Sequence, residues 1–139
     1  MKGNNCSTEK IIMSLKNIRL ELARTNDFPQ GSKQHGYVFT APIDAAGKID
    51  AQEWRGHRDQ CRVVRFWAGE ADEVGHVVRK ADGLWAFHYD IRGDEAADEC
   101  GFNFESHVFA LGEYISINEQ DGALRTFKVT RVDPFGLPE

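Results

Sequence analysis

Cysteine is scarce in this chain of 139 residues, which contains only Cys6, Cys61 and Cys100 and no CxxC pair. Three widely spaced cysteines make a poor disulfide framework and are typical of proteins whose thiols stay reduced. The first residues also lack the apolar stretch and small-residue cleavage site of a secretory signal peptide. The sequence therefore predicts a cytoplasmic protein.

Long apolar runs are missing as well, so we expect no membrane-spanning segment and no membrane partner. A phosphate-binding loop, a dinucleotide-binding glycine pattern, a GxSxG elbow and an HExxH helix are also absent. These absences remove the most recognisable enzyme classes but leave open whether the protein is an enzyme. The net charge of −5 disfavours nucleic acid and favours a small molecule or another protein as the partner.

Tight-turn signals are the most informative feature that is present. The pairs Asp82-Gly83 and Asp121-Gly122 each lie between runs of β-branched and aromatic residues. An Asp-Gly pair in this setting predicts a β-hairpin, because glycine takes a positive φ at no steric cost. Read as three-residue loops, these turns place Ile115 opposite Phe127, and the apolar residues of both strands then share one face.

Short strands close together, with only one helix, predict a mainly β protein, or α+β by element count. We expect a small antiparallel β-barrel or a strongly bent sheet, with a flatter α+β sheet as the alternative. The strands are expected at residues 17–23, 37–40, 62–67, 74–80, 84–90, 114–118 and 124–132, with further short strands considered at 102–104 and 107–109. One short helix is expected over residues 51–60, with Asp50 as N-cap and Glu53 completing a capping box.

Domain organisation is expected to be simple. Residues 17–134 are predicted to form a single β-rich domain, a length that suffices for an independent core. Residues 1–16 are expected to be a poorly ordered extension, with translation starting at either Met1 or Met13, and residues 135–139 a short tail. The acidic stretch that contains Asp94, Glu95, Asp98 and Glu99 is expected to be a solvated loop.

A candidate metal site follows from the register of the first hairpin. A three-residue loop ending at Gly83 places His76 opposite His88, with Asp90 next along the same face. Two imidazoles and one carboxylate can bind a divalent transition metal, which is the only cofactor that the sequence suggests. A slip of one residue would separate the two rings, and an inert pair of surface histidines is the alternative interpretation.

A row of aromatic residues, Trp85, Phe87 and Tyr89, alternates along the strand that carries His88. These side chains would line the core or, if the barrel is open, a ligand-binding groove. The preferred functional hypothesis is therefore a non-catalytic module that binds a small ligand or a protein. A metal-binding protein or metal-dependent enzyme that uses the two histidines and Asp90 is the first alternative.

A basic run supports a second alternative, the binding of single-stranded nucleic acid. Arg55, Arg58, Arg62 and Arg65 lead into Phe66 and Trp67, and such a combination can neutralise and stack on a nucleic acid strand. The acidic residues that follow, including Glu70, oppose this interpretation. Cys61 is expected to lie half-buried under the helix.

Overall fold

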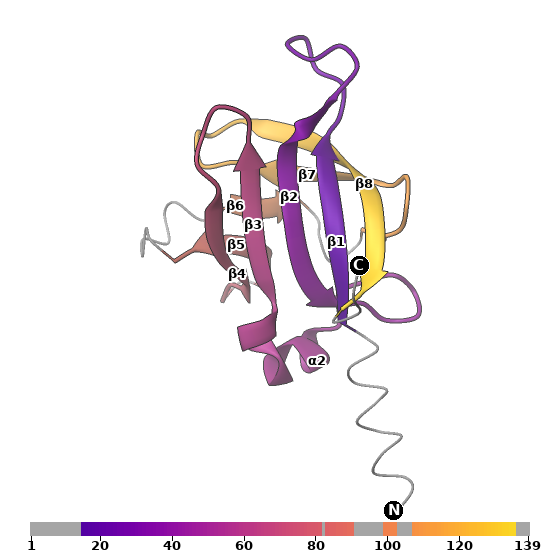
Figure 1. The fold of residues 1–139 in the computed structure, drawn as a ribbon. Helices are drawn as coiled ribbons and strands as arrows, with labels where there is room; N and C mark the ends of the chain where they lie inside the picture. Colours follow the sequence, from indigo (N-terminus) through magenta and orange to yellow (C-terminus); the bar gives the residue numbers. More distant parts are fainter. Residues whose placement is uncertain (1–14, 82, 91–98, 103–106, 136–139) are drawn as a thin grey trace, which may run out of the picture.

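The computed structural model describes residues 15–81, 83–90, 99–102 and 107–135. In this part of the chain, eight antiparallel strands close into a barrel (Figure 1). The strands are β1 (Leu15–Leu22), β2 (Ser32–Pro42), β3 (Arg62–Trp67), β4 (Glu73–Arg79), β5 (Trp85–Tyr89), β6 (Glu99–Phe102), β7 (Tyr114–Asn118) and β8 (Leu124–Pro134). The prediction of a mainly β protein with a barrel-like sheet is confirmed.

The barrel closes where β8 returns to pair with β1, from Lys16 opposite Pro134 to Leu22 opposite Phe127. Strand β1 begins at Leu15, so it includes two residues that the sequence placed in the N-terminal extension. Phe135, expected in the tail, packs against the core. The remaining residues of the predicted extension and tail, 1–14 and 136–139, lie outside the described residues.

Both predicted hairpin turns have the expected geometry. Gly83 and Gly122 have φ angles of +88° and +86°, the left-handed conformation that glycine favours. The N–H of Lys80 donates to the carbonyl oxygen of Leu84 at 2.8 Å, and the equivalent bond from Glu119 closes the second loop. The resulting registers, His76 opposite His88 and Ile115 opposite Phe127, are those that the sequence predicted.

The predicted helix is shorter than expected, because the backbone leaves the α-helical conformation at His57. An α-helix, α2 (Ala51–Gly56), is followed by a 3-10 turn, η1 (Arg58–Gln60). Asp50 is the N-cap, since its carboxylate accepts the N–H groups of residues 52 and 53. The N–H of Asp50 instead bonds to the carbonyl of Pro42, so Glu53 does not close a capping box.

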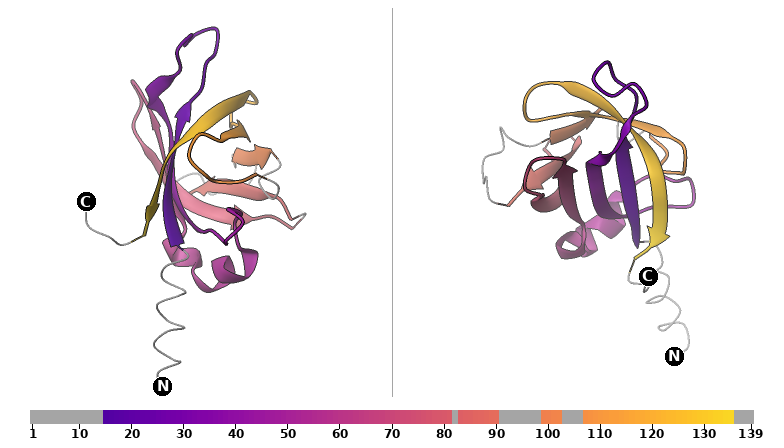
Figure 2. Two further views of the ribbon diagram at one scale, coloured as in Figure 1. Left: turned by 90° about the vertical axis from the view of Figure 1, so that its right-hand side faces the viewer. Right: turned by 45° about the horizontal axis from the view of Figure 1, so that its top comes forward.

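Helix α2 lies across one end of the barrel, as Figure 2 shows. Its buried residue Trp54 contacts the Trp85 ring edge-on, with ring centroids 5.3 Å apart. Cys61, expected to be half-buried, is fully buried in the core. Burial raises the pKa of the Cys61 thiol to about 12, so this side chain behaves as a small apolar residue.

The barrel interior changes character along its axis. Side chains alternate between inside and outside along each strand, and apolar residues such as Phe39 and Val63 fill the half near α2. The next inward-facing pair along these two strands is polar, because Tyr37 lies opposite Arg65. The last pair before the far end joins His35 to Trp67. The interior therefore becomes polar at the end opposite α2.

Candidate functional site

Six polar side chains meet inside the barrel at the end opposite α2, and we refer to them as the interior cluster. They come from six places in the fold: Tyr37, Arg65, Tyr89, Glu99, Glu119 and Arg125. The two carboxylate residues are almost completely buried, with exposed fractions of 0% for Glu99 and 4% for Glu119. Such burial of acidic side chains is rare unless they are paired.

Strand pairing explains why these side chains point inward. Residues directly opposite each other on neighbouring strands project from the same face of the sheet. Glu99 lies opposite the core residue Phe87, and Arg125 lies opposite the core residue Ile117. Glu119 comes two residues after Ile117, so the inward alternation of β7 continues into its turn.

Both oxygens of the Glu99 carboxyl group have hydrogen-bonding partners. The hydroxyl of Tyr89 donates to Oε1 at 2.7 Å, and the hydroxyl oxygen of Tyr37 lies 2.8 Å from the same atom. The backbone N–H of Gln120 donates to Oε2 at 3.1 Å. Tyr37 also contacts Oε2 of Glu119, so one hydroxyl group joins the two carboxyl groups.

Two arginines balance the charge of the interior cluster. Nη1 of Arg125 lies 2.7 Å from Oε1 of Glu119. Nε of Arg65 lies 3.5 Å from Oε2 of Glu119 and 3.7 Å from Oε2 of Glu99. It is a buried donor that makes no hydrogen bond within the described residues. The guanidinium of Arg65 stacks over the Trp67 ring at 4.2 Å from the ring centroid, which closes this end of the cluster.

Burial shifts the ionisation of these groups. It raises the pKa of Glu99, although the hydrogen bonds from Tyr89 and Tyr37 act in the opposite direction. Burial and the nearby Glu99 raise the pKa values of both tyrosines well above their ordinary value. Burial by itself would lower the pKa of Arg65, but Tyr37 and the two carboxyl groups hold it above its ordinary value. Burial therefore favours the protonated forms of Glu99, Tyr37 and Tyr89, and the charged form of Arg65 is kept by its neighbours.

The interior cluster was not foreseen from the sequence. Glu99 does not lie in a solvated loop as predicted, because β6 carries it into the interior opposite Phe87. The other acidic residues of that stretch, at positions 94, 95 and 98, lie outside the described residues. Arg65 is not part of a surface basic strip either, because it is buried beside Glu119. The sequence signal for this position was the alternation of Val63, Arg65 and Trp67, which places Arg65 on the same face of β3 as the core residue Val63.

Two other arginines of the basic run have contacts of their own. Arg58 stacks over the ring of Trp54 at 4.7 Å, and Arg62 lies 3.8 Å from Asp90. With Arg65 inside the barrel, the predicted run is shorter on the surface by one arginine. The binding of nucleic acid stays an untested prediction.

The two histidines of the predicted metal site do face each other across the β4–β5 hairpin. Nδ1 of His76 lies 2.9 Å from Oδ1 of Asp90. The guanidinium of Arg62 approaches Nε2 of His76 at 3.4 Å, where it would repel a bound cation. Among the described residues, no three His, Cys, Asp or Glu side chains are arranged so that they could hold a metal ion.

The predicted aromatic row lies in the core. Its three side chains are buried, with exposed fractions of 2% or less: Trp85, Phe87 and Tyr89. They therefore lie in the barrel interior and not in an open groove. Phe87 packs against Tyr37 and Phe39. Tyr89 contributes its hydroxyl to the interior cluster, a role that the sequence did not indicate.

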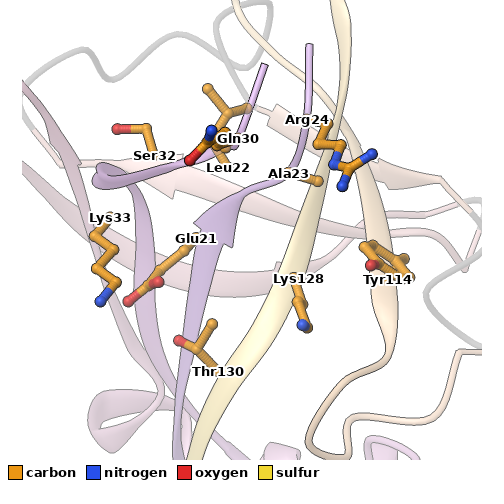
Figure 3. Close-up of a pocket in the computed structure, with 11 residues that line it drawn as sticks. Glu21, Leu22, Ala23, Arg24, Gln30, Ser32, Lys33, Tyr114, Lys128 and Thr130 are labelled. Atoms are coloured by element: carbon orange, nitrogen blue, oxygen red, sulfur yellow. The ribbon is translucent and has the colours of Figure 1, made fainter. Parts of the chain in front are cut away.

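A separate pocket of about 640 Å³ lies on the outside of the barrel, at the same end as the interior cluster (Figure 3). We call it the outer pocket. It is formed by the ends of β1 and β2, the loop between them and the facing parts of β7 and β8. The polar and aromatic side chains that line it include Glu21, Arg24, Lys33, Tyr114, Lys128 and Thr130.

The outer pocket carries a local excess of positive charge. Its one lining carboxylate, Glu21, accepts a 2.7 Å hydrogen bond from Nε of Arg19, which balances its charge. Within the described residues, no carboxylate lies within ion-pair distance of Arg24, Lys33 or Lys128. Figure 3 shows these three cationic side chains arranged around the pocket. The pocket is therefore electrostatically suited to an anion.

The fold and its sites define an antiparallel barrel of eight strands, counted over the described residues, with charged groups buried at one end. No protein-family model, curated protein or solved structure matches the chain at a significant level. None of the described helices is sufficiently long and apolar to cross a membrane. The function is therefore inferred from the residues themselves.

Proposed function

We propose that this barrel is a non-catalytic binding module that takes a small anion, with two or more carboxylate or phosphate groups, in the outer pocket. The observation that carries the proposal is the set of three cations around that pocket, Arg24, Lys33 and Lys128, none of which has a carboxylate partner among the described residues. The net charge of the protein is −5, so a group of three cations differs in sign from the average charge of its surface.

The size and shape of the outer pocket support a small ligand. Its volume of about 640 Å³ is within the range of roughly 300 to 1,000 Å³ that is typical of small-molecule sites. Tyr114 is 55% exposed at its rim and offers an aromatic surface to the body of a ligand. The side-chain amide of Gln30 adds a hydrogen-bond donor to the lining.

Charge and solvent exposure set the expected strength of binding. Contacts between exposed charges contribute only about 0.2 to 1 kcal/mol each, because water and salt screen them. Three such contacts with hydrogen bonds support dissociation constants in the millimolar range. Binding should weaken as the ionic strength rises.

The test is an NMR titration of the labelled protein with citrate and with pyrophosphate at low and physiological salt. We expect saturable shifts in residues 21–33 and 128–130. The double variant Lys33→Gln/Lys128→Gln should weaken binding about tenfold, since two exposed contacts are lost. Lys48→Gln, which removes one charge from a loop outside the outer pocket, is the control and should change binding less than about twofold.

Two results would contradict the proposal. One is the absence of saturable shifts with both anions, and the other is an equal loss of binding in the double variant and the control. If an acidic peptide binds to the same residues more tightly than either anion does, the ligand of the outer pocket is a protein and not a small anion.

A further inference from the structure

One hydroxyl oxygen inside the barrel lies between two carboxyl groups. The hydroxyl oxygen of Tyr37 is 2.8 Å from Oε1 of Glu99 and also contacts Oε2 of Glu119. A phenol has one proton to donate, so it can donate to only one of these oxygens. The other contact is a hydrogen bond only if that carboxyl group is itself protonated and donates to the Tyr37 oxygen. The geometry therefore requires one additional proton.

The surroundings of the two carboxyl groups decide where this proton resides. Glu119 lies 2.7 Å from Nη1 of Arg125 and 3.5 Å from Nε of Arg65, and both cations stabilise its ionised form. Glu99 is fully buried, and its nearest cation is Arg65 at 3.7 Å. Burial also raises the pKa of Glu99. Glu119 is therefore the ionised partner, and Glu99 is the protonated one.

We propose that Glu99 and Glu119 form a buried acid pair that binds one proton at neutral pH, held on Oε1 of Glu99. In this state the Glu99 O–H donates to the oxygen of Tyr37, and the Tyr37 O–H donates to Oε2 of Glu119. Oε1 of Glu99, as a hydroxyl oxygen, still accepts the bond from Tyr89, and Oε2 still accepts the N–H of Gln120. Every contact around Glu99 then has both a donor and an acceptor.

Charged and titratable groups lie around this acid pair on several strands and in one turn. They are His35 and Tyr37 on β2, Arg65 on β3, Glu73 on β4, Tyr89 on β5, Arg125 on β8 and Asp121 in the turn between β7 and β8, which shares Nη1 of Arg125 with Glu119. The side-chain amide of Gln120 connects Glu73 to the cluster, with Nε2 3.1 Å from Oε2 of Glu73. The negative charge of Glu119 further disfavours ionisation of Glu99, because like charges repel in the interior.

Loss of the proton to solvent base would leave two carboxylates around one hydroxyl group, with Arg65 the only cation, among the described residues, close to both. The acid pair therefore makes this end of the barrel sensitive to pH. The pKa of Glu99 is raised above that of an unfolded glutamate. The stability that its proton provides is complete below the unfolded glutamate value of about 4.3 and is lost progressively as the pH rises from there through the folded-state pKa.

The direct test is carbon-13 NMR of the intact protein labelled at the glutamate side-chain carboxyl carbons. We expect one glutamate to show the chemical shift of a protonated carboxyl group at neutral pH. That signal should be absent from Glu99→Gln. Finding every glutamate carboxyl group ionised at neutral pH would overturn the proposal, and this measurement needs no variant.

A second test compares the pH dependence of the melting temperature. The amide nitrogen that Glu99→Gln introduces cannot accept the bond from Tyr89. This variant should therefore melt lower than the wild type at acidic pH but lose the wild-type decline that lies below the tyrosine range of about pH 10. Glu119→Gln should lower the melting temperature most at neutral pH, because it removes the counter-ion of Arg125. The exposed control Glu113→Gln should keep the wild-type profile. An unchanged decline in Glu99→Gln below the tyrosine range of about pH 10 would contradict the assignment.

Discussion

The indole nitrogen of Trp54 donates a 2.9 Å hydrogen bond to the backbone carbonyl of Val77, and this bond fixes α2 to β4. Trp54→Phe keeps an aromatic ring but leaves a buried carbonyl without its partner, so we expect a loss of about 1 to 3 kcal/mol in the free energy of unfolding. Trp54→Ala should cost about 3 to 5 kcal/mol, because it also opens a cavity. Urea denaturation followed by fluorescence and circular dichroism measures both. A Phe variant as stable as the wild type would show that water replaces the bond.

Close approach of two backbones makes Gly36 essential. A Cβ atom on Gly36 would lie 1.9 Å from the carbonyl oxygen of Leu20, so alanine cannot fit unless β1 and β2 separate. We expect Gly36→Ala to destabilise the barrel by several kcal/mol or to prevent folding. The matched control is Gly56→Ala at the end of α2, where nothing lies within 4 Å of the added atom. That change should stabilise the protein by up to about 1 kcal/mol, because alanine favours the helix.

The ion pair between the partly exposed Arg125 and the buried Glu119 should contribute more than a surface pair. Arg125→Ala removes the 2.7 Å partner of a buried carboxylate, and we expect a loss of about 2 to 3 kcal/mol in the free energy of unfolding. Arg62→Ala removes a half-exposed arginine that lies 3.8 Å from Asp90 and should cost less than about 1 kcal/mol. Thermal and chemical denaturation of both variants measure the difference. Equal losses would mean that the interior is accessible to water.

Alkaline titration should distinguish the two buried tyrosines of the folded protein from tyrosines in contact with solvent. Burial and the nearby Glu99 raise the pKa values of Tyr37 and Tyr89 in the folded protein. The stability that their protonated forms provide is present below the unfolded value of about 10 and is lost as the pH rises above it. Two of the three tyrosines should therefore ionise only as the barrel unfolds.

Tyrosinate absorbance recorded together with circular dichroism after a jump to alkaline pH tests this prediction. The late phase of ionisation should have the same rate as the loss of β structure, and Tyr89→Phe should halve its amplitude. Immediate ionisation of all three tyrosines with an unchanged circular dichroism spectrum would contradict it.

Local turn chemistry made much of the fold predictable from the sequence. An αL glycine after each aspartate fixes a three-residue loop, and the loop fixes which residues lie opposite each other. The registers around Gly83 and Gly122 followed from that rule, as did the position of His76 opposite His88. The end of α2 was less predictable, because the change at His57 from α-helix to 3-10 turn has no distinct residue signal.

The interior cluster was not predictable in the same way, because it depends on contacts between distant segments. Tyr37 is 62 residues from Glu99 and 82 residues from Glu119 along the chain. Composition also argued against it, since glutamate in an acidic stretch and arginine in a basic run are usually solvated. Only the closed barrel brings these charges together and gives each one a partner.

Pairing of β1 with β8 joins the first and last strands of the described chain. A ribosome therefore releases β1 long before its partner has been made, and the barrel cannot close until β8 has emerged. During that interval β1 and the growing end of the sheet have unsatisfied backbone groups that another chain can use. Truncations that shorten β8 should for this reason produce aggregates during synthesis rather than smaller soluble barrels.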